Sequence, residues 1–141
     1  QQTLSPSDVG FHNCLRTSEK KLFFVDFEYF GRDDPAKMIS DFLLHPAMNL
    51  SFALKKRFLS NLLDCMDQGQ SELRKRIEAY YPLFGLKWCL ILLNQFLPSY
   101  WEYRQKETVE APGLYMTLND QLDKARDMLA KVEREYERFP Y

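Results

Sequence analysis

The spacing of the hydrophobic residues changes near residue 35. Before that point, two short apolar segments at residues 11–15 and 22–25 flank a polar turn at residues 17–20. Short apolar segments separated by turn residues favour paired strands. After residue 35, apolar residues recur every three or four positions, which is typical of amphipathic helices. We therefore predict a mainly α fold with a small β-hairpin, four or five helices and no large sheet.

Proline and capping residues predict the limits of the first helix. Asp34 followed by Pro35 is typical of a helix start, with Asp at the N-cap and Pro at the first helical position. Pro46 is expected to end this helix, and residues 30–33 before it are expected to form a loop. Ser51 is expected to begin a second helix.

Further helices are expected beyond a break at Gly69. Ser71 would cap the next helix, and Pro82 either kinks it or begins another. Residues 83–93 are apolar on nearly all sides, as in the central helix of an α domain. The last helix is expected to begin near residue 117 or 119 and to pack on its own domain. Its apolar stripe consists of Leu118, Leu122, Ala125, Leu129, Val132 and Tyr136.

Length and composition narrow the class of protein. The 141 residues, 45% of them hydrophobic, are enough for one domain with a substantial core. A net charge of −1 makes neither nucleic acid nor an anionic membrane an expected partner. Cys14, Cys65 and Cys89 have no zinc-type spacing, and we expect reduced, buried thiols in a cytoplasmic protein. The longest apolar segment, residues 83–97, is interrupted by polar residues and is too short to span a membrane.

The candidate catalytic and metal-binding residues are concentrated around the predicted hairpin. Asp8 comes just before the first strand, Asn13 follows five residues later, and Asp26 closes the second strand. Because paired strands fold back on each other, a tight hairpin would bring Asn13 and Asp26 to the same end. Hard oxygen ligands at one place, beside another carboxylate, suit Mg²⁺ and a phosphate.

These residues resemble a known family. Asp-x-x-x-x-Asn, then a hairpin, then an apolar segment ending in Asp resembles the catalytic and metal loops of protein-kinase-like phosphotransferases. The segment Asp26-Phe27-Glu28-Tyr29 is similar to choline kinases, and Gly31-x-x-Asp34-Pro35 resembles a G-W-x-D-P motif of aminoglycoside phosphotransferases. The resemblance covers residues 5–45 and continues weakly to Trp88. One departure is Pro6, where the family has a His that braces the loop.

The resemblance implies a domain organisation. It implies that residues 1–141 are a helical C-terminal lobe, with a catalytic loop at about residues 5–13 and a metal loop at about residues 24–29. The family's Gly-rich nucleotide-binding lobe precedes such a lobe and is not found in these residues. We therefore expect the chain to be part of a longer enzyme and to be inactive alone. Apolar surface near Val9, Phe11 and Phe27 is then expected to be exposed and to favour self-association.

The resemblance also implies roles for individual residues, with ATP and Mg²⁺ as cofactors. Asp8 would orient the attacking hydroxyl and accept its proton, and Asn13 and Asp26 would hold Mg²⁺ on the phosphates. His12 is expected to be structural. The candidate substrate-binding residues are Glu28, Asp34, Phe84 and Trp88. Asp34 also serves as a helix cap, and Phe84 and Trp88, which share one helix face, are either core aromatics or a cage for a quaternary ammonium.

Several functions remain open at this point. The resemblance favours a kinase for a hydroxyl of a small molecule that is aminoglycoside-, choline- or sugar-like. A non-catalytic helical interaction module, or a pseudokinase fragment, is the alternative, because a fold alone does not determine function. An unrelated helical scaffold would require the motif to be accidental.

Overall fold

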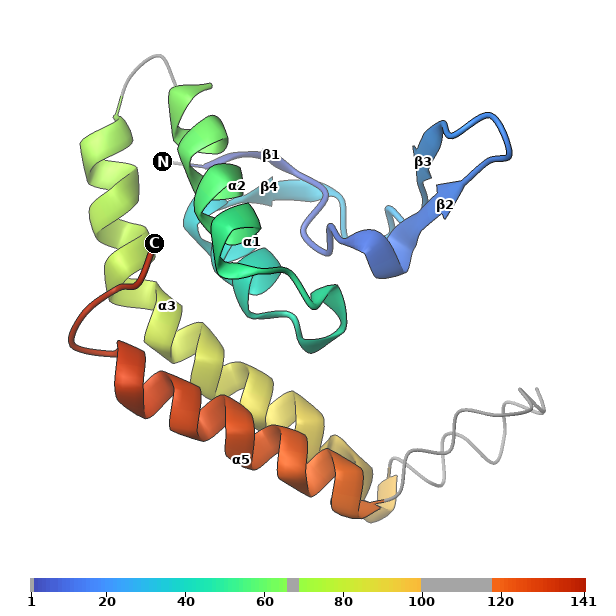
Figure 1. The fold of residues 1–141 in the computed structure, drawn as a ribbon, viewed down its shortest axis with the longest axis vertical. Helices are drawn as coiled ribbons and strands as arrows, with labels where there is room; N and C mark the ends of the chain where they lie inside the picture. The colour runs from blue at the N-terminus through green and yellow to red at the C-terminus, as the bar shows by residue number, and fades with distance from the viewer. Residues whose placement is uncertain (1, 66–68, 100–117) are drawn as a thin grey trace.

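The computed structural model describes residues 2–65, 69–99 and 118–141, and their fold is mainly helical with two small antiparallel two-stranded sheets (Figure 1). The strands are β1 (Thr3–Ser5), β2 (Cys14–Arg16), β3 (Leu22–Phe24) and β4 (Gly31–Asp33). The helices are α1 (Pro35–Leu44), α2 (Phe52–Asp64), α3 (Gln70–Leu93) and α5 (Leu118–Glu135), with single 3-10 turns η1 (Phe11–Asn13), η2 (Pro46–Met48) and η3 (Asn94–Phe96). The prediction of a mainly α fold with a small hairpin is confirmed.

The predicted hairpin forms, although it is shorter than expected. β2 and β3 pair in antiparallel register, with Cys14 opposite Phe24 and Arg16 opposite Leu22. The residues before Cys14 were expected to extend the first strand, and that expectation is wrong. The amide of Asn13 donates to the carbonyl of Gly10 at 3.1 Å, which winds this segment into η1.

A second sheet joins the start of the chain to the segment before α1. β1 and β4 are antiparallel, with Thr3 opposite Asp33 and Ser5 opposite Gly31. The prediction of a loop over residues 30–33 is therefore wrong. Strands of three residues offer too few positions for an apolar alternation to be visible in the sequence.

The first helix has the limits that the sequence predicts. Asp34 caps α1 by accepting a hydrogen bond from the amide of Ala36 at 2.9 Å, and Pro35 occupies the first turn. The helix ends at Leu44, two residues before Pro46. Ser51 caps α2 as expected, through the amide of Leu54 at 3.4 Å.

The core lies along α3, which packs against both α1 and α5 (Figure 1). Gly85 on α3 faces Val132 on α5, and a Cβ at Gly85 would overlap the Val132 side chain. The glycine therefore allows the two helices to approach closely. The buried residues include Ile39, Leu43 and Leu44 from α1, Leu59 from α2, Leu73, Ile77 and Tyr81 from α3, and Ala125 and Met128 from α5.

Helix α3 differs from the prediction at its start, and at its centre it excludes one of the two alternatives for Pro82, the start of a new helix. It begins at Gln70, after Gly69 in the left-handed conformation with φ 80°, and Ser71 is not its cap. It also continues through Pro82 as a single helix. Proline removes one backbone hydrogen bond, and burial of the flanking Tyr81 and Gly85 in the core holds the helix together across that gap.

Two predicted apolar faces are only partly buried. The segment 83–93 was expected to be buried all round, but Leu83 is 60% exposed and Leu90 is 67% exposed. On α5, Ala125 and Val132 are buried as predicted, while Leu118, Leu129 and Tyr136 are exposed. Contact with α3 instead selects the row formed by Gln121, Ala125, Met128 and Val132.

Two further expectations concern the burial of the cysteines and the ability of the helices to span a membrane. Cys89 is buried, but Cys14 is half-buried and Cys65 is exposed, so the expectation of three buried thiols is right only for Cys89. All three thiols are free. Within the described ranges, none of the helices combines the length and the apolar character needed to cross a bilayer.

Candidate functional site

The hairpin register brings Asn13 and Asp26 to the same end of the ribbon, as the sequence predicts. The last strand pair joins Cys14 to Phe24, and the amide of Val25 donates to the carbonyl of Asn13 at 2.9 Å. Asp26 follows Val25 directly and is exposed. Two oxygen-bearing side chains therefore leave the open end of the hairpin at the level of its final cross-strand bond.

Asp26 has an unusual backbone conformation. Its φ is 64°, in the left-handed region that residues other than glycine seldom adopt, although Asp tolerates it better than most. Such conformations recur at ligand-binding and catalytic positions. Asp26 lies two residues beyond the end of β3, so this conformation redirects the chain just after the last cross-strand bond of the hairpin.

Asp8 lies in the loop between β1 and η1, and the Asn13 side chain holds it. The amide nitrogen Nδ2 of Asn13 donates to the backbone carbonyl of Asp8 at 3.1 Å and to its Oδ2 at 3.3 Å. Asp8 is exposed. The structure thus brings Asp8 and Asn13 into direct contact and places Asp26 beyond the adjacent strand end.

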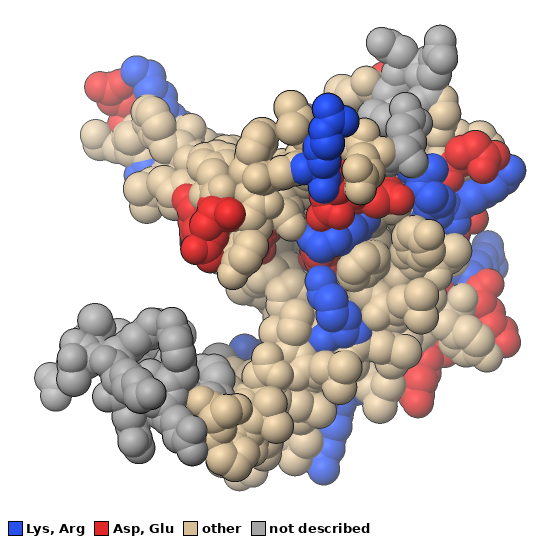
Figure 2. Space-filling view, turned by 180° about the vertical axis from the view of Figure 1, so that it is seen from behind, with Lys and Arg blue, Asp and Glu red and all other residues tan. Residues whose placement is uncertain are grey.

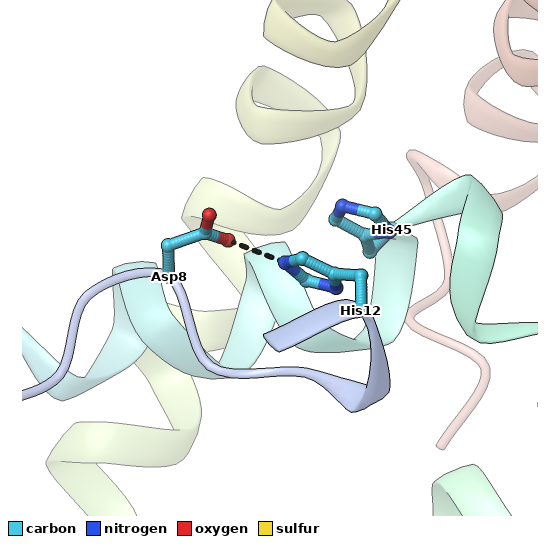
Figure 3. Close-up of side chains that lie close together, drawn as sticks. All are labelled: Asp8, His12 and His45. Carbon is cyan, nitrogen blue, oxygen red and sulfur yellow. Dashed lines mark hydrogen bonds and ion pairs between the residues drawn. The ribbon is translucent and has the colours of Figure 1, made fainter. Parts of the chain in front are cut away.

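The other carboxylate oxygen of Asp8 contacts His12, as Figure 3 shows. Nε2 of His12 lies 3.1 Å from Oδ1 of Asp8. The His12 ring stacks on His45, with centroids 4.1 Å apart and planes 7° from parallel. A Cβ at Gly10 would overlap the His12 ring, so the glycine leaves room for this arrangement. His12 therefore contacts the candidate catalytic carboxylate itself, although the resemblance assigns it no role.

His45 joins this loop to the helical core. It follows α1, and its ring meets Trp88 of α3 edge-on with centroids 4.6 Å apart. Burial lowers the pKa of His45 and the neighbouring His12 lowers it further, while Asp8 and Asp41 act in the opposite direction. The neutral imidazole is therefore favoured. Sequence reasoning does not single out His45, because no spacing rule links it to His12.

The cluster of Asp8, His12 and His45 could be considered as a metal site, since one ligand atom of each lies within 4.8 Å of the others. Its geometry argues against this. The lone pair of a ring nitrogen lies in the ring plane, so two parallel stacked rings cannot both direct one at the same ion. Nδ1 of His45 also accepts the amide of Ala47 at 3.1 Å, which places the proton of the neutral ring on Nε2. The arrangement suits hydrogen bonding to a carboxylate.

Further contacts anchor the Asp8 loop on α1 and η2. Lys37 donates to Oγ of Ser7 at 2.7 Å and lies 3.1 Å from the Asp33 carboxylate. The amide of Phe11 donates to Sδ of Met48 at 3.2 Å. These contacts restrain the loop, in which Pro6 stands where the family has a bracing His.

Phe84 and Trp88 lie near each other, but a cation of the chain itself occupies their faces. Nζ of Lys87 is 4.9 Å from the Phe84 ring centroid and 5.7 Å from that of Trp88. Asp41 accepts from Lys87 at 2.7 Å and from Nε1 of Trp88 at 3.0 Å. An external quaternary ammonium would have to displace Lys87, so this geometry argues against a choline cage at this pair.

Asp34 is engaged in structure. Its Oδ1 caps α1, and its Oδ2 pairs with Nε of Arg76 at 3.1 Å. This pair ties α1 to α3, and substrate contact by Asp34 would have to compete with it.

Glu28 lies beside Asp26 and helps to make the region acidic. A hydrogen bond and the charge of Glu28 raise the pKa of the Tyr29 hydroxyl, to which the charges of Asp26 and Asp8 also contribute. Figure 2 shows acidic side chains at the base of the projecting hairpin. A divalent cation would reduce this repulsion.

Comparison of the chain with protein-family models, with curated proteins and with solved structures gave no match.

Proposed function

We propose that the chain carries the catalytic and metal loops of an ATP-dependent phosphotransferase that acts on a hydroxyl of a small molecule. In this proposal the fold is the C-terminal lobe of a protein-kinase-like enzyme, similar to aminoglycoside phosphotransferases and choline kinases. The observation that carries the proposal is the hairpin register, which brings Asn13 and Asp26 to one end while Asn13 holds Asp8. The spacing in the sequence and the folded geometry support the same set of residues.

The donor atoms of Asn13 and Asp26 fit Mg²⁺. Nδ2 of Asn13 is used on Asp8, which leaves Oδ1, its cation-binding atom, without a hydrogen-bond partner among the described residues. Asp26 likewise makes no ion pair within the described part of the chain and is exposed. These two oxygens would hold Mg²⁺, which supplies charge stabilisation on the transferred phosphoryl group when bound.

Asp8 is suited to receive a proton from an attacking hydroxyl. Its carboxylate is exposed and is oriented from two sides, by Asn13 on Oδ2 and by His12 on Oδ1. A positioned general base contributes about 10²–10⁴-fold to rate. His12 thus has a positioning role next to the base, beyond the structural role expected from the sequence.

The alternative is a non-catalytic helical module. It is favoured by one observation, the exposed leucines Leu83, Leu86 and Leu90 along one side of α3. A face of this kind often marks a protein-interaction surface. It does not account for the contacts around Asp8.

The test is phosphoryl transfer from labelled ATP by a protein that carries this chain together with any sequence that precedes it. Acceptors should include an aminoglycoside, choline and neutral and acidic sugars. We expect Asp8→Asn to lower kcat by about 10²–10⁴-fold, and Asp26→Asn to abolish turnover and to weaken Mg²⁺ binding. Asp64→Asn, the same chemical change at an exposed position on α2, is the control. Wild-type turnover in Asp26→Asn would contradict the metal assignment.

A further inference from the structure

A pocket of about 290 Å³ lies between the segment that follows α1 and helix α5. Its apolar floor includes Leu44 and Met128. We call this cavity the lysine pocket. Its polar lining consists of His45, Asn49, Lys55, Lys124, Asp127 and Lys131. Three of these side chains carry ammonium groups and only Asp127 carries a carboxylate. The lining therefore has an excess of positive charge.

Two of the lysines are half-buried and come from two different helices. Lys55 on α2 donates to the carbonyl of Leu43 at 2.6 Å, and Lys131 on α5 lies 5.8 Å from the Tyr81 ring centroid. Neither makes an ion pair with a carboxylate among the residues that the structure describes. Each ammonium has three donors, so both have donors left for a ligand.

The two ammonium groups are close enough to affect each other. Burial first, and then the charge of Lys131, lower the pKa of Lys55 to about 8, against a smaller opposing effect of Glu135. Glu135 itself accepts the hydroxyl of Tyr81 at 2.9 Å. An anion placed between the two lysines would offset both the repulsion and the cost of burial.

The lysine pocket adjoins the candidate catalytic loop. His45 lines the pocket and stacks on His12, which in turn contacts Asp8. Only two imidazole rings therefore separate the pocket from the candidate base. An acceptor held there would have to extend past these two rings for its hydroxyl to meet Asp8.

We propose that the lysine pocket binds a phosphate or carboxylate group of a small molecule, and that this molecule is the acceptor substrate. The second part rests on the proposed function; the first does not. The charge of the pocket selects an acidic acceptor and disfavours a polycation such as an aminoglycoside. The occupant is thus an alcohol that also carries an anionic group.

The first experiment measures anion binding without catalysis. Inorganic phosphate is titrated into the protein in a metal-free buffer, so that binding through Mg²⁺ at Asp26 is excluded, and the NMR shifts of the Asn49 and Met128 amides are followed. We expect saturable shifts, and a loss of affinity of about tenfold or more in Lys131→Gln. Lys55→Met retains the aliphatic stem and should show a similar loss if Lys131→Gln fails to fold.

The control is Lys56→Gln, which removes the same charge from an exposed neighbouring position on α2. We expect its phosphate affinity to match the wild type. Absence of saturable shifts, or equal weakening by Lys56→Gln, would overturn the anion site.

The second experiment compares acceptors in the phosphoryl-transfer assay. An acidic sugar and its neutral counterpart are used with wild type and Lys131→Gln. We expect Lys131→Gln to raise KM about tenfold or more for the acidic acceptor only, with little change in kcat. Phosphate binding without any transfer would support the pocket and contradict the proposed function. Transfer with equal KM values for the two acceptors would contradict the substrate class.

Discussion

At the level of single residues, His45 shows how one side chain can make several contacts at once. Its Nδ1 caps η2 through Ala47, its ring stacks on His12, and its edge meets Trp88. The same residue also lines the lysine pocket. The cap and the stack both favour the neutral ring, because a protonated His45 would lose its cap acceptor and repel His12.

The lowered pKa of His45 leads to a prediction about pH. Between about 6.5, the ordinary His value, and the lower folded value, the unfolded state binds more protons than the folded state. The free energy of unfolding should therefore fall as pH falls below about 6.5, and the fall should stop below the folded pKa. His45→Asn keeps an acceptor for the Ala47 amide, and we expect it to lose less stability between pH 7.5 and 5.5. Urea unfolding at the two pH values measures this, and an equal loss in both proteins would contradict it.

At this scale the sequence predicts the candidate site in part. The spacing of Asp8, Asn13 and Asp26 is local to one hairpin, so turn geometry alone brings the last two together. The contacts of His45, Lys55 and Lys131 depend on how helices pack, and no short-range spacing encodes that. Asp34 shows both outcomes in one residue, because its local capping role was predictable and its pair with Arg76 was not.

At the level of elements, the helices follow from local signals better than the strands do. The caps of α1 and α2 and the end at Pro46 agree with the sequence, since capping chemistry is local. β4 was missed, and the choice between a helix that continues through Pro82 and one that begins there was left open. Both depend on partners elsewhere in the chain, β1 in one case and the core in the other.

The close approach of α3 and α5 gives a prediction about Gly85. Gly85→Ala gains about 1 kcal/mol of helix propensity, but its Cβ would overlap Val132, a valine with a restricted rotamer. We expect a net loss of about 1–3 kcal/mol in the free energy of unfolding. Chemical denaturation measures this.

Two further variants test the cause. Val132→Ala should destabilise alone, and in combination with Gly85→Ala it should cost less than the sum of the two changes. Gly31→Ala is the matched control, because no atom lies within 4 Å of a Cβ there. Additive effects of Gly85→Ala and Val132→Ala on the free energy of unfolding would show that overlap with Val132 is not the cause of the loss in Gly85→Ala.

At the level of the whole molecule, a helical body carries a projecting hairpin (Figure 1). The hairpin and the segment after it expose several large apolar side chains: Leu15, Leu22, Phe23, Phe24, Phe27 and Phe30. Phe11 and Phe27 are 53% and 51% exposed, as the sequence predicts, while Val9 is half-buried. α3 exposes a second apolar face around Leu90.

We expect the 141-residue chain to self-associate through the hairpin region, because aromatic side chains gathered there remain in contact with water. Sedimentation velocity over a range of protein concentrations should show association, and Phe23→Ser with Phe27→Ser should reduce it. Leu90→Ser tests the α3 face in the same way and should leave the association unchanged. The reverse outcome would place the contact on α3.

The pairing of β1 with β4 has a topological consequence. Three residue pairs, Thr3 with Asp33, Leu4 with Arg32 and Ser5 with Gly31, close residues 6–30 into a single loop, and Asp8, Asn13 and Asp26 all lie on it. Closing such a loop costs entropy that grows only slowly with its length, and ordering the residues within it costs more for each residue. The seam is one of several attachments of this loop, because Ser7, Phe11 and His12 also contact α1, η2 and His45. Opening the seam alone would leave the loop tethered to the helices, so the order of the three side chains depends on the seam and these contacts together.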